Sequence, residues 1–368
     1  MTDVLTRKEL NRTTLARQML LAREQATVPQ AVERLLAMQA QQARPPFLGL
    51  WSRLADFSAG QLHAALHGRE VVRATYVRAT LHLLSGRDYL TFRLAIQPML
   101  TAAVNSILNR TGGGPLDDEL LIPAARSVLS AGPRDFGAVR DLLHERFPDV
   151  NDRALGYAVR MNLPLVMVPT KDRWAFPAVA DFTLADTWLG STPLDSESLD
   201  LLVPRYLAAF GPATPADMQT WSGMPRLKPV FEKLRPRLRT FRDERGLELF
   251  DVPDAPRPEP DAIAPVRFLP DFDSLLLAHA DRTRIVPEEH RPRLITKNLR
   301  VPAAFLCDGF VRGTWQLTRR SKAATLTVTP FEVLPRQAVT DLTDEGHRLL
   351  GFAEPDAEKL DVRFSPAR

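Results

Sequence analysis

The sequence predicts an α+β fold made of three tandem winged helix-turn-helix motifs followed by a C-terminal α/β subdomain. Two observations predict this fold. The order helix, helix and two-stranded ribbon occurs three times before residue 254. A proline-rich stretch, VPDAPRPEPDAIAPV (252–266), then has the composition of a linker and separates the repeats from a strand-rich end. A length of 368 residues suits two or three domains.

The first motif is expected within residues 1–114. Apolar residues at helical spacing predict a helix over VPQAVERLLAMQAQQ (28–42). SAGQLHAALHGRE (58–70) predicts a second helix with Ser58 as its N-cap. VVRATYVRATLHLLS (71–85) is rich in β-branched residues and alternates in polarity, which is typical of a β-ribbon.

The second motif is expected within residues 115–195 and the third within 196–254. For the second we expect helices over 117–131, 135–147 and 151–162, then a wing of LPLVMVP (163–169) and RWAFP (173–177) around a polar turn. For the third we expect helices over 198–211, 214–223 and 224–237, then a hairpin around Arg245-Gly246. The copies share a pattern of elements and almost no identical residues, and single winged helices also serve as protein-interaction modules.

The C-terminal subdomain is expected within residues 255–368. Asp308-Gly309 lies between two apolar runs in AAFLCDGFVRGTWQL (303–317), which predicts a β-hairpin. A second strand pair is expected around TRRSKAATLTV (318–328), and a final helix over TDEGHRLLGFAE (343–354).

The composition excludes several classes of protein. We find no signal peptide and no apolar run near the roughly 18 residues that a membrane helix needs, so a cytoplasmic location is expected. Cys307 is the single cysteine, which excludes an internal disulfide and a four-cysteine metal site. GxxxxGK[ST] and zinc-deaminase motifs are absent from the sequence. His63 and His67 are four residues apart without a HExxH carboxylate, so neither a metal nor a cofactor is expected.

The net charge of +4 and a pI near 9.4 describe a mildly basic chain. Seven of the 48 basic residues are lysines, so arginine dominates. Two explanations of this excess of arginine remain open: codon bias in a GC-rich genome, or an arginine-rich face that binds phosphates. Three winged-helix patterns in a basic chain favour a nucleic-acid partner.

The segment MQAQQARPP (38–46) places Gln39, Gln41 and Gln42 where the first predicted helix ends. On a regular helix, residues two apart point about 200° from each other. Gln39 and Gln41 therefore converge only if the backbone leaves the helix near Ala40, which the following prolines favour. From these residues alone, a polar helix end and a ligand-holding amide pair both remain open.

Four segments together resemble the winged-helix superfamily of bacterial DNA glycosylases typified by AlkZ. They lie in family order over about 300 residues and are LLAMQAQQARPPFLGLWSRL, RATLHLLSGRDY, FLPDFDSLLLAHADRTRI and AAFLCDGFVRGTW. The resemblance implies three winged helices in a C-shaped arrangement around a DNA-binding cleft. It also implies that the family motif Gln, apolar residue, Gln falls on Gln39, Ala40 and Gln41 as the catalytic pair. A sister branch carries Asp at the second glutamine, and this chain does not.

The resemblance implies a monomeric enzyme that acts on double-stranded DNA containing alkylated purines. Guanine alkylated at N7 is cationic and leaves readily, so two neutral amides need only position water at C1′. Unhooking of interstrand crosslinks, as self-resistance to an alkylating natural product, is the expected role. Lys8 and Lys171 are the only lysines before residue 228 and lie outside the motif, so a Schiff base is not expected and the enzyme is predicted to be monofunctional.

Further site residues are expected around this pair. Thr80 and His82 lie on one face of the predicted strand, where they line the pocket or have a structural role. The candidates for DNA contact are Arg44, Arg73, Arg282, Arg284, Asn298, Arg300 and Arg312. The competing hypothesis is a non-catalytic winged-helix DNA-binding protein or transcriptional regulator, although no dimerisation helix or ligand domain is evident.

Overall fold

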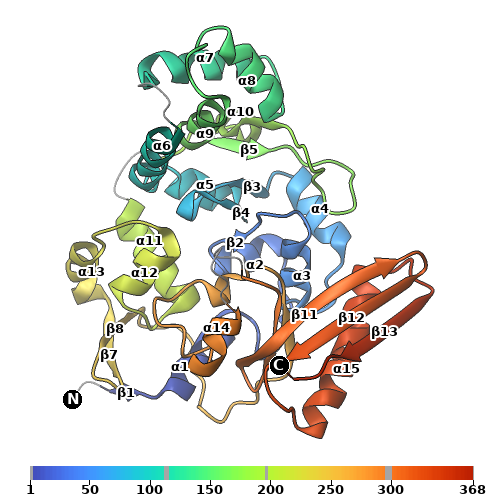
Figure 1. Cartoon of the computed structure of the whole chain (residues 1–368). Helices are drawn as coiled ribbons and strands as arrows, with labels where there is room; N and C mark the ends of the chain where they lie inside the picture. Colours follow the sequence, from blue (N-terminus) through green and yellow to red (C-terminus); the bar gives the residue numbers. More distant parts are fainter. Residues whose placement is uncertain (1–2, 112–115, 195–197, 295–300, 368) are drawn as a thin grey trace.

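The computed structural model describes residues 3–111, 116–194, 198–294 and 301–367. These residues form a mixed α+β fold with fifteen α-helices and three β-sheets, which confirms the predicted class. In Figure 1 the helices around α7 and α8 lie at one end, and the C-terminal sheet lies at the opposite end beside α15. A five-stranded sheet lies between them and carries the candidate site.

The central sheet has the order β2-β4-β3-β5-β6, and every neighbouring pair is antiparallel. Its strands are β2 (Met38–Gln39), β4 (Leu81–Ser85), β3 (Val71–Thr75), β5 (Leu165–Met167) and β6 (Phe182–Leu184). The ribbon predicted for residues 71–85 is confirmed as β3 and β4. Ala74 pairs with Val166, so strands from the first and second predicted motifs share one sheet.

The predicted second wing is partly wrong. Its first strand is present as β5, but RWAFP (173–177) is not a strand, and β6 provides the partner instead. Residues 170–175 form a tight loop, because the amide of Ala175 donates to the carbonyl of Asp172 at 2.7 Å and Ala175 has φ +63°. Such a conformation breaks the extended backbone that a strand requires.

The helix predicted over residues 28–42 is also too long. The helix α2 (Val28–Arg34) ends early, and Leu36 then has φ +64°. This left-handed residue turns the chain out of the helix into β2. The next helices are α3 (Pro45–Trp51) and α4 (Ala59–His67), and the predicted N-cap Ser58 forms a capping box with Gln61.

Among the remaining helices of the first three predicted segments, α7, α8, α9, α11, α12 and α13 agree with the sequence pattern, whereas α5, α6 and α10 had no sequence prediction. The N-terminus adds β1 (Val4–Leu5) and α1 (Arg7–Arg17). The others are α5 (Gly86–Phe92), α6 (Gln97–Thr111), α7 (Asp118–Ser130), α8 (Phe136–His144), α9 (Asp152–Asn162), α10 (Ala185–Leu189), α11 (Ser198–Phe210), α12 (Pro215–Ser222) and α13 (Lys228–Leu234). The predicted hairpin is β7 (Arg239–Asp243) and β8 (Glu248–Asp251), and β1 joins β7 in parallel.

The C-terminal sheet has the order β13-β12-β11-β10-β9. Its strands are β9 (Arg267–Leu269), β10 (Ala304–Cys307), β11 (Phe310–Arg320), β12 (Ala323–Pro330) and β13 (Lys359–Phe364), with α14 (Arg291–Leu294) and α15 (Arg336–Ala353) beside them. The predicted turn is present, since Asp308 and Gly309 have φ +48° and +78°. Both two-stranded hairpins are confirmed. The final helix is present but begins at Arg336, earlier than the predicted residue 343, and β9, α14 and β13 had no sequence prediction.

Two buried ion pairs connect these parts of the chain. Arg17 on α1 binds Asp251 on β8, with N–O distances of 2.7 and 2.8 Å. Arg53, just after α3, binds Asp273 at 2.8 and 2.9 Å. The second pair fixes the FLPDFD segment against the segment that carries Gln39, because Pro270, Asp271 and Asp273 line one small cavity with Gln39. Among the described helices, none has the length and apolar character that crossing a bilayer requires.

Candidate active site

The glutamine motif begins in β2, at the edge of the central sheet, and continues into the bend after this strand. Gln39 pairs with His82 of β4, and the amide of Ala40 donates to the carbonyl of Leu81 at 2.7 Å. Strand β2 ends at Gln39, and Gln41 lies in the bend that follows it. Ala40 is fully buried in the main core. The predicted departure from helical geometry near Ala40 is therefore confirmed.

The Gln39 side chain is held by Arg78 in η1 (Val77–Ala79). The Arg78 Nη2 donates to Gln39 Oε1 at 2.7 Å. A guanidinium only donates, so this bond fixes the carbonyl toward Arg78 and turns the amide NH₂ away. Burial, followed by the nearby charge of Arg282, lowers the pKa of Arg78 to about 10, so Arg78 remains a cation at neutral pH.

Arg78 has a left-handed backbone conformation, which glycine adopts more easily than other residues. Arg78 and Ala79 have φ values of +54° and +56°. The Arg78 Nη1 donates to the carbonyl of Trp221 near the C-terminal end of α12, where helix carbonyls lack intrahelical partners. A Cβ on Gly223 would lie 3.4 Å from the Arg78 Cα, so the turn packs closely on this helix end. Arg78 therefore connects Gln39 to the third predicted segment.

Gln41 is exposed and less constrained than Gln39. Its Oε1 accepts a long bond of 3.4 Å from the amide of Leu81. Its backbone is fixed by Arg73 on β3, which donates to the carbonyls of Ala40 at 2.9 Å and Gln41 at 3.2 Å. Arg73 is buried and its side chain lies over the Phe176 ring, so the structure gives it the surroundings of a positioning residue and not of a phosphate contact.

Thr80 and His82 lie beside the motif on the adjacent chain. The Thr80 hydroxyl donates to the carbonyl of Val77 at 3.2 Å, and the Thr80 carbonyl lies 3.0 Å from His82 Nδ1. His82 is buried against Tyr76, and its Nε2 has no hydrogen-bond partner among the described residues. Burial, followed by the charge of Arg78, lowers the pKa of His82 to about 3, so this imidazole is neutral at pH 7.

Buried neutral histidines are expected to make the protein sensitive to acid. Burial also lowers the pKa of His279 to about 3, so both groups bind protons more tightly when unfolded, where the value is 6.5. Their contribution to the free energy of unfolding is fully present above pH 6.5 and is lost as the pH falls toward 3. Between pH about 7.5 and about 5.5, each histidine should lower the free energy of unfolding by about 1.4 kcal/mol. Urea unfolding of the wild type and of His82→Gln at both pH values measures this difference.

The control for this measurement is His347→Gln, because His347 is an exposed histidine on α15. His347→Gln should keep the full wild-type pH dependence of the free energy of unfolding. His82→Gln should lose about half of the pH dependence that the two buried histidines cause. An unchanged pH dependence in His82→Gln would show that His82 is not the responsible group.

Arg44 lines a cavity of about 370 Å³ next to the motif. The cavity also touches Gln42, Asp271 and the sheet residues Thr314 and Gln316. Arg44 Nε and Nη2 are buried without a hydrogen-bond partner in the described chain, and burial lowers its pKa. Its guanidinium lies 5.8 Å from the centre of the Trp174 ring. Arg44 is thus a cation with unused donors beside the glutamine motif.

The other predicted DNA contacts differ in their surroundings. Arg282 is half-buried and close enough to Arg78 to lower its pKa. Arg312 is paired with Glu332 at 2.7 Å. Asn298 and Arg300 lie outside the described residues.

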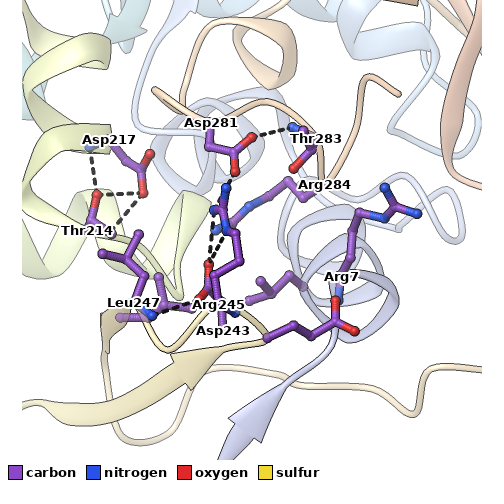
Figure 2. A pocket seen from close by; sticks show the side chains of 12 residues that line it. Arg7, Thr214, Asp217, Asp243, Arg245, Leu247, Asp281, Thr283 and Arg284 are labelled. Atoms are coloured by element: carbon purple, nitrogen blue, oxygen red, sulfur yellow. Dashed lines mark hydrogen bonds and ion pairs between the residues drawn. The ribbon is translucent and has the colours of Figure 1, made fainter. Parts of the chain in front are cut away.

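Arg284 lies in a separate cavity of about 320 Å³ (Figure 2). It is buried and donates to the carbonyl of Pro212 at 2.8 Å. The same cavity is lined by four carboxylates, those of Asp217, Asp243, Glu244 and Asp281, and Arg245 bridges Asp243 and Asp281. Arg7, Arg245 and Arg284 line the cavity with these four carboxylates, so the carboxylates offset the positive charge and the arrangement does not support Arg284 as a DNA contact.

Sequence reasoning missed Arg78, which holds the side chain of Gln39. It lies in the quoted RATLHLL region, two residues before Thr80, and nothing in its neighbours distinguishes it from other arginines. Its left-handed backbone and its contact with α12 arise only when distant segments pack together. A signal for it is therefore absent from a single sequence.

Comparisons with known proteins place the chain in a family. The family model described as DNA glycosylase AlkZ-like matches residues 32–352. A relative from Streptomyces sahachiroi, described as an interstrand DNA cross-link repair glycosylase, is 26% identical over 353 residues, which cover 88% of this chain and 91% of that protein. The solved structure of Streptomyces sahachiroi DNA glycosylase AlkZ has a TM-score of 0.80 at 20% identity, covering 98% of this chain and all of that one. The chain therefore belongs to the AlkZ-like DNA glycosylase family.

Proposed function

We propose that this glycosylase hydrolyses the N-glycosidic bond of N7-alkylguanine and related alkylated purines in double-stranded DNA, and that it is monofunctional. The observation that supports this most is the Gln39-Ala40-Gln41 segment at the edge of the central sheet, where the Gln39 carbonyl is held by Arg78 and the Gln41 carbonyl contacts the amide of Leu81. Two neutral amides suit a cationic base that leaves without strong acid catalysis. No lysine lies in the motif to form a Schiff base.

The two amides have different roles in this proposal. Arg78 occupies one lone pair of Gln39 Oε1, so Gln39 presents its NH₂ as a donor to an oxygen of the water or the sugar. Within the described part of the chain, Gln41 Oε1 has only the 3.4 Å contact with Leu81, so it is the freer acceptor for the proton of the attacking water. Together they orient this water toward C1′ while the positively charged base departs.

We further propose that bulky adducts and interstrand crosslinks are substrates, and that the enzyme gives self-resistance to a DNA-alkylating natural product. The cavity of about 370 Å³ beside Arg44 supports this, because it leaves room next to the motif for atoms beyond the base. The Streptomyces sahachiroi relative is described as an interstrand DNA cross-link repair glycosylase, which also supports crosslinks as substrates.

For the architecture, we propose three winged-helix units with boundaries 1–114, 115–195 and 196–254, and a C-terminal subdomain over 255–368. The enzyme acts as a cytoplasmic monomer in this proposal and uses neither metal nor cofactor. Thr80 and His82 border the reacting nucleotide, and Arg44, Arg282 and Arg312 are the described arginines among the original candidates that remain proposed phosphate contacts.

The test uses a duplex that carries one N7-methylguanine and an undamaged duplex of the same sequence. The expected result is free N7-methylguanine and an abasic site that alkali converts to a strand break, with no break before alkali. The Gln39→Ala, Gln41→Ala double variant provides the background. Strand breaks no more frequent than with this variant would exclude the substrate, and tight binding to one undamaged sequence would instead indicate a regulator.

A further inference from the structure

Four arginines surround a cavity of about 340 Å³ between α6, α8 and α9, at the end of the molecule away from the C-terminal sheet (Figure 1). They are Arg110 on α6, Arg140 on α8, and Arg153 and Arg160 on α9. Phe136, Tyr157, Gly156 and Ile107 complete the lining, so none of the acidic residues that the structure describes borders the cavity. We call these four side chains the arginine cluster.

The arginine cluster lacks counter-charges within the described part of the chain. None of its guanidinium groups lies within 4.0 Å of a carboxylate there, although most buried or half-buried arginines elsewhere are paired. Arg110 and Arg140 donate only to the backbone carbonyls of Ser106 and Phe136 within their own helices. Cations that converge without an anion repel each other, and a bound anion relieves that repulsion.

Local packing directs two of these arginines to the cavity. Gly156 faces Arg140, and a Cβ at this position would lie only 3.0 Å from Arg140 Cδ, so glycine makes room for the arginine stem. Arg160 lies 5.6 Å from the centre of the Tyr157 ring. Its Nε is buried without a hydrogen-bond partner among the described atoms, and burial lowers its pKa. A guanidinium with an unused buried donor is suited to a phosphate oxygen.

We propose that the arginine cluster is a phosphate-binding site that holds the DNA backbone away from the glutamine motif. The inference rests on the DNA-binding function of the family, and it is independent of which lesion is excised. Phosphodiester oxygens match its chemistry, because arginine binds phosphates through paired N–H donors. The Arg284 cavity provides the contrast, since its carboxylates cancel the positive charge there.

The first test compares Arg140→Ala, Arg160→Ala with wild type in the full-length protein. Fluorescence anisotropy on an undamaged duplex should show about 10-fold weaker binding and a salt slope smaller by about 2, near 0.9 for each lost phosphate contact. The excision rate at saturating enzyme, measured on the N7-methylguanine duplex, should stay within about twofold, since the glutamine motif is untouched. Loss of binding without loss of the saturating rate separates this site from the catalytic one.

A matched control removes two arginines that do have partners. Arg87→Ala, Arg363→Ala lowers the net charge equally, but Arg87 pairs with Glu33 and Arg363 pairs with Asp361. This control should keep the wild-type affinity and salt slope. Equal weakening in both double variants would show a general charge effect and would overturn the proposal. Arg110→Gln, Arg153→Gln gives a second variant with two exposed side chains, should the first pair fail to fold.

Inorganic phosphate distinguishes the two possible sources of the anion. A cluster built for free phosphate predicts that phosphate raises the melting temperature of wild type but not of the variant, while duplex affinity is equal in both. That pattern would overturn the assignment to DNA. If the cluster variants lose duplex affinity while no protein excises N7-methylguanine, the phosphate site stands and the proposed substrate is wrong.

Discussion

Alanine at both Gln39 and Gln41 should reduce the single-turnover release of N7-methylguanine by about 10³-fold or more, to near the rate of the unassisted reaction. The variant removes the donor that Arg78 orients and the acceptor that lies beside Leu81. Misplacing a reacting water by about 1 Å already costs about 10²-fold, and here both of its partners are lost. Release of the base under excess enzyme, followed by chromatography, measures the rate directly.

The single variants separate the two proposed roles. Gln41→Ala removes the freer acceptor, whereas Gln41→Asp restores an acceptor that is a stronger base, as in the sister branch of the family. Gln41→Asp should therefore recover part of the lost rate, with activity falling at low pH as the carboxylate is protonated. In Gln39→Ala, no change at residue 41 should restore the rate, because the lost NH₂ of Gln39 has a different partner in the reaction.

Gln42 provides a matched control within the same segment. It is exposed, one residue beyond Gln41, and has the same side chain. Gln42→Ala should retain the single-turnover rate within about twofold. A comparable loss of rate in Gln42→Ala and in Gln41→Ala would show that the number of amides in this segment matters, and not the position of Gln41.

Local sequence signals predicted most of the fold because they act over short distances. Ser58 caps its helix as expected, in a capping box with Gln61. Asp308-Gly309 forms the predicted turn. The errors occur where a local pattern competes with distant packing. Residues 35–40 have helical spacing, yet pairing with Leu81 and His82 draws them into the sheet.

The candidate site was predictable only in part, for a related reason. The requirement that Gln39 and Gln41 share a side of the chain already demanded non-helical backbone at Ala40, and the structure has it. Which arginines face DNA was not predictable, since charge is visible in sequence and burial is not. Arg73 and Arg284 are buried against backbone carbonyls, while the arginine cluster assembles from three helices whose arrangement a single sequence does not contain.

Arg78→Ala should lower the saturating excision rate by about 10²-fold while DNA affinity stays within about threefold. The guanidinium touches Gln39 and the end of α12, so its loss frees the Gln39 amide to rotate without removing the glutamine. Arg78→Lys should not rescue the rate, because one ammonium does not reproduce the fork that binds Gln39 and Trp221 together. Single-turnover excision and anisotropy on the same duplex separate the rate from the affinity.

Arg78→Gly distinguishes positioning from mere stability. Both Arg78→Gly and Arg78→Ala remove the guanidinium, but glycine accepts the backbone angle of +54° and alanine is strained there. The glycine variant should be more stable than the alanine variant by about 1 kcal/mol. If Arg78 positions Gln39, the two variants lose the same fraction of activity despite this difference. If activity follows stability instead, the glycine variant will be the more active, and Arg78 will have only a structural role.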